Sequence, residues 1–276
     1  MKAIIDSGST KADFVFVGKD RKIIQLKTVG FNPLATDYQP FIDSYINHPD
    51  RPTESVQEVF FYGAGCSTEQ AISTAKEVLS QLFPEAKIQV QDDLLGAARA
   101  TSQGKASMVA ILGTGSNSCL FNGTKIIDHV SNLGYLLGDE GGGFAIGKEV
   151  LRSFFYRELP PELTIAFQDQ YQLSRNQLIQ RIYQSKAPNR EIAAFAEFAV
   201  AHRSNPAIKK LVANVFQEFI DRNLKKYQVT TSIPVHFIGS ISYIFRNRIE
   251  EILEQNHLLP GVFLRKPIDG LIEFHS

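Results

Sequence analysis

The sequence predicts an α/β protein built from two halves of similar design. Short apolar strands alternate with longer stretches of helical periodicity along most of the chain. A strand, a turn rich in glycine and hydroxyl groups, a second strand and a hairpin follow one another near residue 2, and again near residue 106. A repeated unit that opens each half indicates internal duplication. The length of 276 residues suits one large domain or two medium ones.

The first of these segments opens the chain. An apolar strand runs into the turn Asp6-Ser7-Gly8-Ser9-Thr10, and apolar residues 14–17 form the next strand. A hairpin at residues 18–20 leads into a third strand at 22–28. Glycine lets backbone N–H groups turn toward an anion, and hydroxyl groups add donors. Asp6 is an acid of the kind that holds Mg²⁺, usually through water.

The second segment has the same order. The apolar run 108–112 has the pattern of a strand buried on both faces. It breaks at Gly113-Thr114-Gly115-Ser116-Asn117, resumes at 118–121 and reaches the hairpin signal Asn122-Gly123. Alone, such a stretch is more often a tight turn than a phosphate site. Its repetition favours two turns that face each other and hold a polyphosphate, although neither turn has the Walker A spacing.

The remainder of the first half alternates strands and helices. Asn32-Pro33 requires extended or turn geometry, and Asn32 is either a turn former, which the sequence alone favours, or an amide that faces a ligand. A strand at 59–62 precedes Ser67-Thr-Glu-Gln70, which has the pattern of a capping box for a helix ending near Leu82.

Two adjacent acids, Asp92 and Asp93, follow the next short strand, 87–90. Ligands gather at the C-terminal ends of strands in open α/β sheets. An acid at this position either caps the helix that follows or acts as a catalytic base. Because one acid is enough for the cap, the other is available for catalysis, and the two roles are about equally supported.

The second half contains a loop of unusual glycine content. Five of the ten residues from Gly138 to Gly147 are glycine, with Asp139 and Glu140 among them. This density has an entropic cost, so it indicates a loop that lets the backbone approach a ligand. A largely helical stretch, 148–227, follows, and strand 233–238 then runs into Gly239-Ser240 and a helix. That turn is either a seat for the ribose or adenine of a nucleotide or a plain helix cap.

Composition excludes several classes of function. Lysine plus arginine and aspartate plus glutamate both number 29, so the formal charge is zero. A neutral chain without a basic cluster argues against nucleic acid or an acidic membrane as a main partner. Two cysteines give no disulfide framework, and the six histidines show no metal-ligand spacing. Without a leader pattern or a long apolar run, we expect a cytoplasmic protein.

Four segments follow one another along the chain: the turn at 6–10, the turn at 113–117, the loop at 138–142 and the turn at 239–242. That order resembles the actin-like, sugar-kinase and heat-shock ATPase superfamily. Within it the chain is similar to the N-acetylglucosamine kinase group of the BadF/BcrA-type ATPases. The resemblance implies two ribonuclease-H-like domains with ATP and sugar in the cleft between them, the second domain being enriched in helices. We expect domains at 1–105 and 106–266, with segment 267–276 a candidate addition to the first.

The resemblance also implies roles for individual residues. The family's catalytic acid precedes two small or apolar residues and a glycine, which here matches Asp93-Leu94-Leu95-Gly96 and selects Asp93 over Asp92. Asp6 would hold Mg²⁺ by way of water. The residues implied to contact the phosphates are Gly8, Ser9, Thr10 and Lys11 in the first turn and Gly113, Thr114 and Gly115 in the second; those implied to contact the sugar are Asn32, Asp93, Asn117, Gly134 and Asp139; and Gly239 and Ser240 match the adenosine turn.

The function implied is that of a homodimeric kinase that uses ATP and Mg²⁺ to phosphorylate an amino sugar, N-acetylglucosamine at its 6-hydroxyl. Leu133 stands where related kinases often carry tryptophan, so glucosamine, N-acetylmuramic acid and glucose remain alternatives. One rival is a BadF-type ATPase that activates a dehydratase or reductase through an iron–sulfur cluster, with Cys66 and Cys119 as its ligands. The other is a sugar sensor that has lost turnover.

Overall fold

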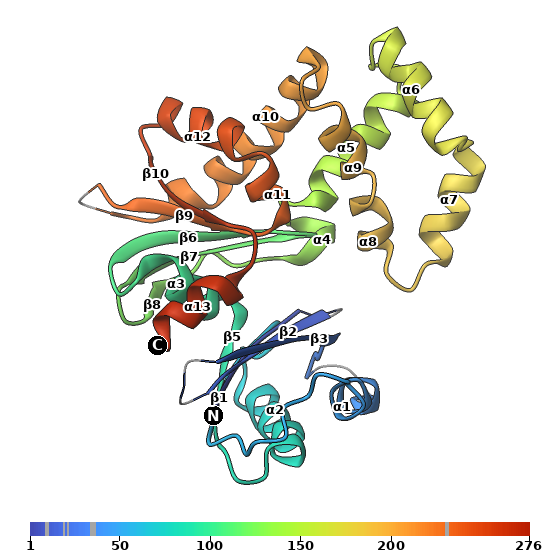
Figure 1. The fold of residues 1–276 in the computed structure, drawn as a ribbon. Helices are drawn as coiled ribbons and strands as arrows, with labels where there is room; N and C mark the ends of the chain where they lie inside the picture. The colour runs from blue at the N-terminus through green and yellow to red at the C-terminus, as the bar shows by residue number, and fades with distance from the viewer. Residues whose placement is uncertain (9–10, 19, 21, 34–36, 230–231) are drawn as a thin grey trace. The chain divides into compact units, whose positions relative to one another are not determined.

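The computed structural model describes residues 1–8, 11–18, 20, 22–33, 37–229 and 232–276 (Figure 1). The chain divides into two compact units. Unit 1 comprises Met1–Lys105, Gly123–Lys125 and Lys266–Ser276; unit 2 comprises Ala106–Asn122 and Ile126–Arg265. Each unit contains one five-stranded sheet and its covering helices, so the predicted α/β architecture is confirmed.

The sheet of unit 1 is mixed. Its strands are β1 (Lys2–Ser7), β2 (Lys11–Val17), β3 (Ile23–Val29), β4 (Glu58–Gly63) and β5 (Lys87–Asp92), in the spatial order β3-β2-β1-β4-β5. The first three strands form an antiparallel meander, whereas β4 and β5 join β1 in parallel. The parallel strands therefore bring their C-terminal ends to one edge of the sheet.

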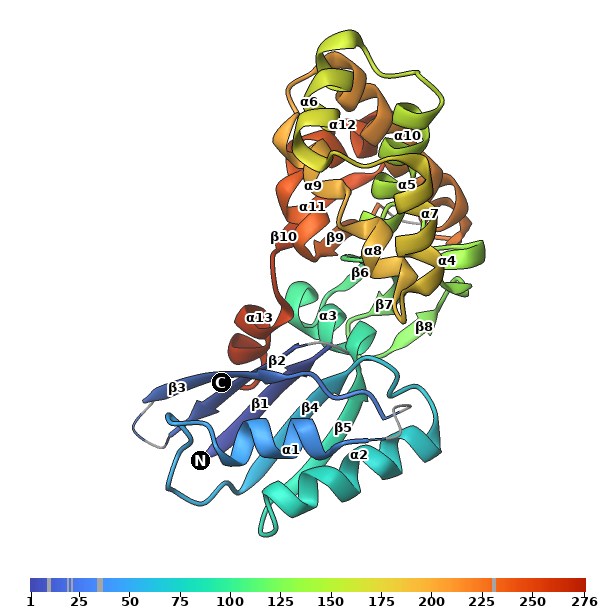
Figure 2. The ribbon, with the colours of Figure 1, turned by 90° about the vertical axis from the view of Figure 1, so that its right-hand side faces the viewer.

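Helices cover both faces of this sheet (Figure 2). Helices α1 (Gln39–Ile46) and α2 (Glu69–Leu82) cover one face, where Ile5, Phe14 and Phe16 enter a shared apolar core. Helices α3 (Asp93–Ser102) and α13 (Pro267–Phe274) pack together on the other face. Successive side chains of a strand point to opposite faces, so residues that alternate with this core point toward α3 and α13.

A polar chain of contacts ties α3 and the C-terminal segment to the sheet. The Tyr62 hydroxyl accepts a hydrogen bond from Arg99 Nη1 at 3.0 Å and lies 2.8 Å from Nε2 of His275. Burial, followed by the charges of Arg99 and Lys2, lowers the pKa of His275 to about 4. The ring is therefore neutral at pH 7, and Tyr62 can donate to it while accepting from Arg99.

Unit 2 repeats the topology of unit 1. Its strands are β6 (Ala106–Leu112), β7 (Ser116–Asn122), β8 (Ile126–Asp128), β9 (Pro234–Ile238) and β10 (Leu259–Leu264), in the order β10-β9-β6-β7-β8. Here too an antiparallel meander comes first, and two later strands add in parallel beside its first strand. Two sheets with one strand order support the duplication inferred from the sequence.

A long helical segment between β8 and β9 makes unit 2 the larger. Its helices are α4 (Gly134–Leu137), α5 (Gly143–Phe155), α6 (Pro161–Tyr171), α7 (Arg175–Gln184), α8 (Pro188–Ala193), α9 (Ala196–Ala201), α10 (Pro206–Arg222) and the 3₁₀ turn η1 (Leu224–Lys226). Helices α11 (Ser240–Ile244) and α12 (Arg246–Gln255) then connect β9 to β10. None of the helices described is both long and apolar enough to cross a membrane.

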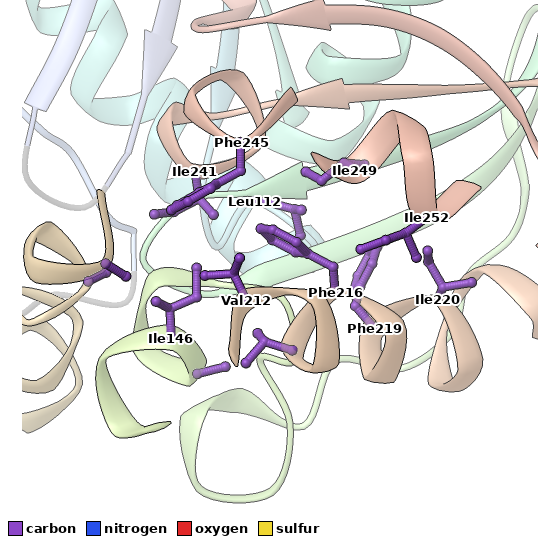
Figure 3. Close-up of a cluster of buried hydrophobic side chains, with 14 of the residues drawn as sticks. Leu112, Ile146, Val212, Phe216, Phe219, Ile220, Ile241, Phe245, Ile249 and Ile252 are labelled. Carbon is purple, nitrogen blue, oxygen red and sulfur yellow. The ribbon is translucent and has the colours of Figure 1, made fainter. Parts of the chain in front are cut away.

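Part of the core of unit 2 packs around the end of β6, just before the turn at residues 113–117 (Figure 3). Leu112, the last residue of β6, packs in one buried cluster with Phe216 and Phe219 of α10 and with Ile241 and Phe245 near α11. These five side chains are all less than a tenth exposed. The turn that follows Leu112 therefore stands on a rigid, close-packed base.

The predicted capping box of α2 is wrong. The N-cap is Thr68, whose extended backbone lets its hydroxyl accept from the N–H of Ala71 at 3.2 Å. A box on Thr68 would require glutamate or glutamine at position 71, where the chain has alanine. The helix therefore begins at Glu69 with a simple threonine cap.

Candidate functional site

Two carboxylates share one face of the unit 1 sheet. Asp6 on β1 and Asp13 on β2 are direct cross-strand partners. Their neighbours Ile5 and Phe14 belong to the core under α1 and α2, so the strand alternation directs both acids toward α3 and α13. Like charges directly opposite each other repel. This pair therefore needs a compensating cation.

Lys266 supplies that cation. Its Nζ lies 2.7 Å from each carboxylate oxygen of Asp13, although the two residues are 253 positions apart in the chain. The pKa of Asp6 is raised to about 7, chiefly by burial, then by the charges of Asp13 and Asp93, with Lys266 acting in the opposite direction. Asp13 and Asp93 are therefore each close enough to Asp6 to act on its carboxyl group. Sequence reasoning did not identify Asp13 or Lys266.

The adjacent acids Asp92 and Asp93 have different structural positions. Asp92 is the N-cap of α3, and its Oδ1 accepts from the N–H of Leu95 at 2.6 Å. Asp93 is the first residue of the helix. Its pKa is raised to about 6, first by burial and then by Asp92, while the N–H groups of Leu94 and of Asp93 itself lower it. Such a group holds a proton weakly near neutral pH, as a general base must.

Asp6 and Asp93 lie at the same edge of the sheet. The parallel register aligns Asp6 with Tyr62 on β4, and Tyr62 in turn with Gln91 on β5. Asp93 follows two residues after Gln91. The C-terminal ends of the strands thus bring together the predicted metal ligand and the predicted base.

Asp6 is the residue at which the predicted magnesium site can be compared with the structure. Mg²⁺ keeps several waters and usually takes only one or two protein carboxylates together with substrate phosphates. In the described part of the chain no group of three or more histidine, cysteine, aspartate or glutamate side chains could form an all-protein metal site. Asp6 is partly buried, and the neighbouring acids oppose its ionisation, so it is compatible with a ligand set completed by water and phosphate.

The first turn is braced from inside unit 1. The N–H of Phe31 donates to the buried hydroxyl of Ser7 at 2.8 Å, which fixes Asn32 beside the turn. Gly8 N–H donates to the carbonyl oxygen of Lys11 at 3.1 Å, and Lys11 itself is exposed. Ser9 and Thr10, both predicted phosphate contacts, lie outside the described residues. Ser7 is a further positioning residue that the sequence pattern did not single out.

The second turn is closely packed against the start of α5. The N–H of Gly143 donates to the carbonyl oxygen of Gly113, and that of Phe144 to the carbonyl oxygen of Thr114, both at 2.8 Å. The first N–H groups of the helix are thereby used within the protein. The predicted phosphate contacts Gly113 and Thr114 are therefore held in place by bonds from the helix, and the N–H of Gly113 donates to the carbonyl oxygen of Gly115 at 3.0 Å.

Asp139 lies directly against this turn. Its Oδ1 accepts from the N–H of Ser116 at 3.0 Å. A Cβ on Gly115 would come within 2.4 Å of the same carboxylate, so only glycine permits this approach. Asp139 has φ +61°, a left-handed conformation that aspartate tolerates better than most residues. The structure thus joins the predicted sugar-binding acid to the predicted phosphate turn.

The other predicted sugar contacts of unit 2 differ in their surroundings. Gly134 begins α4 with φ +68°, and its N–H donates to Oδ1 of Asn132 at 2.6 Å. Asn117 lies on β7, and its Oδ1 accepts from the N–H of Ser118 at 3.0 Å and lies 2.9 Å from Nε2 of His129. Gly134 is therefore linked through Asn132 to Asp139, whereas the described bonds of Asn117 lead to His129.

The predicted adenosine turn closes against the end of β6. Gly239 has φ +120°, and a Cβ there would come within 2.2 Å of the Leu112 carbonyl oxygen. Its N–H donates to the carbonyl oxygen of Leu264, and its own carbonyl oxygen accepts from the N–H of Tyr243, both at 3.0 Å. Ser240 opens α11 and is exposed. The turn thus meets the residue that precedes Gly113.

The two cysteines are poor candidates for a surface cluster. Cys66 and Cys119 are 1% and 0% exposed, and they belong to different units. Burial, followed by the charges of Asp93 and Asp92, raises the pKa of Cys66 to about 12. A thiolate ligand is disfavoured under these conditions. The position of Cys66 near Asp93 was not apparent from the sequence.

Comparisons with known proteins add a family context. Neither the protein-family models nor the curated proteins that were searched gave a match. Among solved structures, a putative N-acetylglucosamine kinase from Porphyromonas gingivalis is 37% identical, with a TM-score of 0.92 over 100% of this chain and 98% of that one. A second putative N-acetylglucosamine kinase, from Chromobacterium violaceum, has a TM-score of 0.74 at 15% identity over 100% and 98% of the two chains.

A glucokinase of the ROK family from Streptomyces griseus, solved with glucose and AMPPNP, is also similar. Its TM-score is 0.59 at 13% identity, over 99% of this chain and 97% of that one. At identities of 13% and 15% these likenesses concern the fold alone. The 37% identity over the whole chain shows common family membership.

We predict that Gly239→Ala destabilises the protein more than Gly104→Ala. Both glycines have positive φ, +120° and +76°, so each alanine has a conformational cost of about 1–3 kcal/mol. A Cβ at Gly104 meets nothing within 4 Å, whereas one at Gly239 would clash with the Leu112 carbonyl oxygen. We expect an additional loss of about 2 kcal/mol or more for Gly239→Ala in urea unfolding. Equal losses for the two variants would show that this close contact is unimportant.

Proposed function

The chain belongs to the N-acetylglucosamine kinase-like group of the BadF/BcrA-type ATPases, and from that premise we propose that it is an ATP-dependent sugar kinase. Its proposed acceptor is an amino sugar, N-acetylglucosamine at the 6-hydroxyl. The observation that supports the proposal is the difference in structural position between two adjacent acids. Asp92 is committed to the α3 cap, while Asp93 has a pKa raised to about 6 at the edge of the sheet.

Asp93 is the proposed general base. Its carboxylate would accept the proton of the sugar hydroxyl as that oxygen attacks the γ-phosphoryl group of ATP. The O–H bond breaks, a new P–O bond forms, and the bond between the γ-phosphorus and the bridging oxygen breaks to release ADP. A pKa near 6 leaves most of Asp93 ionised at pH 7 yet still basic enough to take a proton. Base catalysis of this kind contributes about 10²–10⁴-fold in rate.

Asp6 is the residue proposed to hold Mg²⁺, by way of water. When bound, the ion offsets negative charge on the phosphates. Asp6 lies opposite Asp13, and the charges of Asp13 and Asp93 both raise its pKa, so a cation bound at Asp6 would reduce this repulsion. Lys266 already neutralises Asp13. This leaves Asp6 as the carboxylate of the cross-strand pair whose charge a cation would balance.

The glycine-rich turns are proposed to position the substrates. Gly8 and Lys11, with Ser9 and Thr10, would contact the phosphates, as would the turn Gly113–Gly115 that α5 holds in place. Gly239 and Ser240 would contact the adenosine, and Asn32, Asn117, Gly134 and Asp139 the sugar. Phosphoryl transfer depends mainly on positioning and electrostatics, so a site of backbone N–H groups, amides and few acids suits it.

We predict that Asp93→Asn lowers sugar-dependent ADP release by about 10²–10⁴-fold, because asparagine cannot accept the proton. The matched control is Asp92→Asn. Asparagine caps helices as well as aspartate does, so the bond from the Leu95 N–H is retained and activity at pH 8 should stay within about threefold. The assay measures ADP release across a panel of amino sugars and plain hexoses.

Three outcomes would contradict the proposal. If Asp93→Asn retained activity comparable to that of Asp92→Asn, Asp93 would not be the base. If ADP release ignored every sugar, the protein would be an ATPase of another kind. A protein that bound sugar without any turnover would instead be a sensor.

The pH profile gives an independent check. Asp93 must be ionised to act, so kcat/KM should rise as the pH increases through about 6 and then level off. The negative charge of Asp92 contributes to the raised pKa of Asp93. The acid limb of Asp92→Asn should therefore move to lower pH, measured at saturating Mg²⁺. A limb that stayed in place or moved to higher pH would exclude Asp93 as the titrating group.

A further inference from the structure

Asn132 makes a set of contacts that the proposed catalytic roles do not explain. It lies in the loop between β8 and α4, and no role was predicted for it. We propose that Asn132 is a positioning residue that couples the phosphate turn, residues 113–116, to the sugar loop, residues 133–139. The inference rests on the proposed function, because that function assigns ligands to the two segments. It adds a path by which binding of one substrate prepares the site for the other.

The Asn132 amide uses both of its ends. Its Nδ2 donates to Oδ1 of Asp139 at 3.1 Å and also to the carbonyl oxygen of Ser116. Its Oδ1 accepts from the N–H of Gly134 at 2.6 Å. One side chain thus contacts Ser116, which ends the phosphate turn and begins β7, the acid of the sugar loop, and the glycine that opens α4.

These bonds form a closed ring. Ser116 donates its N–H to Asp139 at 3.0 Å, and Asn132 bonds both to Asp139 and to the carbonyl oxygen of Ser116. A displacement of Asp139 by a sugar hydroxyl therefore acts on both backbone polar groups of Ser116. Because Gly115 lies against the same carboxylate, a displacement of Asp139 also changes the packing of the turn.

Asparagine suits this position because the ring requires two donors and one acceptor from a single short side chain. An amide offers two N–H donors and a carbonyl acceptor. Aspartate offers acceptors only, and serine a single donor. The loop also has few other attachments, since Leu133, Leu136 and Leu137 are 61%, 78% and 75% exposed. Among the remaining contacts of this loop, the Tyr135 ring meets Phe144 edge-on, with centroids 5.5 Å apart.

The alternative is that Asn132 only shapes its own turn. The bond from the Gly134 N–H to Oδ1 is a local Asx turn of the kind that asparagine and aspartate both make. Asn132→Asp separates the two explanations, because it keeps that acceptor and removes both donors. A local role survives this substitution, whereas coupling between the two segments does not.

The test is hydrogen–deuterium exchange of the full-length protein with Mg²⁺ and AMPPNP as the probe and no sugar. In the wild type, the nucleotide should slow amide exchange at 113–118 and also at 132–139. In Asn132→Asp, slowing should persist at 113–118 and disappear at 132–139. Protection at 113–118 confirms that the variant is folded and binds nucleotide. Asn176→Asp, a change at an exposed position of α7, is the matched control and should behave like the wild type.

A binding experiment measures the same coupling as an affinity. Saturating AMPPNP should tighten wild-type sugar binding about fivefold or more, and this factor should fall to about one in Asn132→Asp. If AMPPNP still slowed amide exchange at 132–139 in Asn132→Asp as much as in the wild type, the coupling role would be overturned and the kinase proposal would stand. If the wild type showed no protection at 113–118, the assignment of the phosphate turn would be wrong, and the proposed function and this inference would both fall.

Discussion

The first unit depends on how it holds partly buried carboxylates on one face of its β-sheet. Asp6 and Asp13 are cross-strand neighbours, and Asp93 lies close enough to raise the pKa of Asp6. Burying charge is costly unless it is paired. Lys266, held on both oxygens of Asp13, supplies one pairing and leaves Asp6 and Asp93 with raised pKa values.

This arrangement has a consequence for stability. A carboxyl whose pKa is raised by folding contributes its stability below the ordinary carboxyl pKa, and that contribution is lost as the pH rises through the folded value. For Asp93 and Asp6 the window ends near pH 6 and 7 respectively. At neutral pH, the ionised acids therefore reduce the stability of the fold. A bound cation would recover part of that free energy.

The second unit has the same topology, but different interactions hold its turn in place. Its turn is held by backbone bonds to α5, by the approach of Asp139 to Gly115, and by the packing of Leu112 among Phe216, Phe219 and Ile241. The strand order of the two sheets is the same, so the duplication preserved the scaffold. The sites on the two copies have diverged. The first contains several neighbouring acids and a lysine, whereas the second contains one aspartate, Asp139, bonded to an amide and a backbone N–H.

The sequence predicted the features that local pattern controls. The repeated meander and the strand-end turns follow from periodicity, and capping chemistry indicated that one of the adjacent acids Asp92 and Asp93 caps α3. The choice of Asp93 as the base came from the family resemblance. The sequence did not reveal the pairing of Asp13 with Lys266, because those residues meet only when the C-terminal segment joins unit 1. Asn132 was missed for a related reason, since its partners lie on β7 and beyond α4. The capping box failed because a one-residue shift of the cap placed Ala71 at the reciprocal position.

The most direct test of the central claim is to follow the γ-phosphoryl group. Phosphorus-31 NMR of a mixture of the protein, Mg²⁺, ATP and N-acetylglucosamine distinguishes a sugar 6-phosphate from free phosphate. The account predicts sugar 6-phosphate and ADP in equal amounts, with little free phosphate when the sugar is omitted. Free phosphate that appears at the same rate with or without sugar would contradict it.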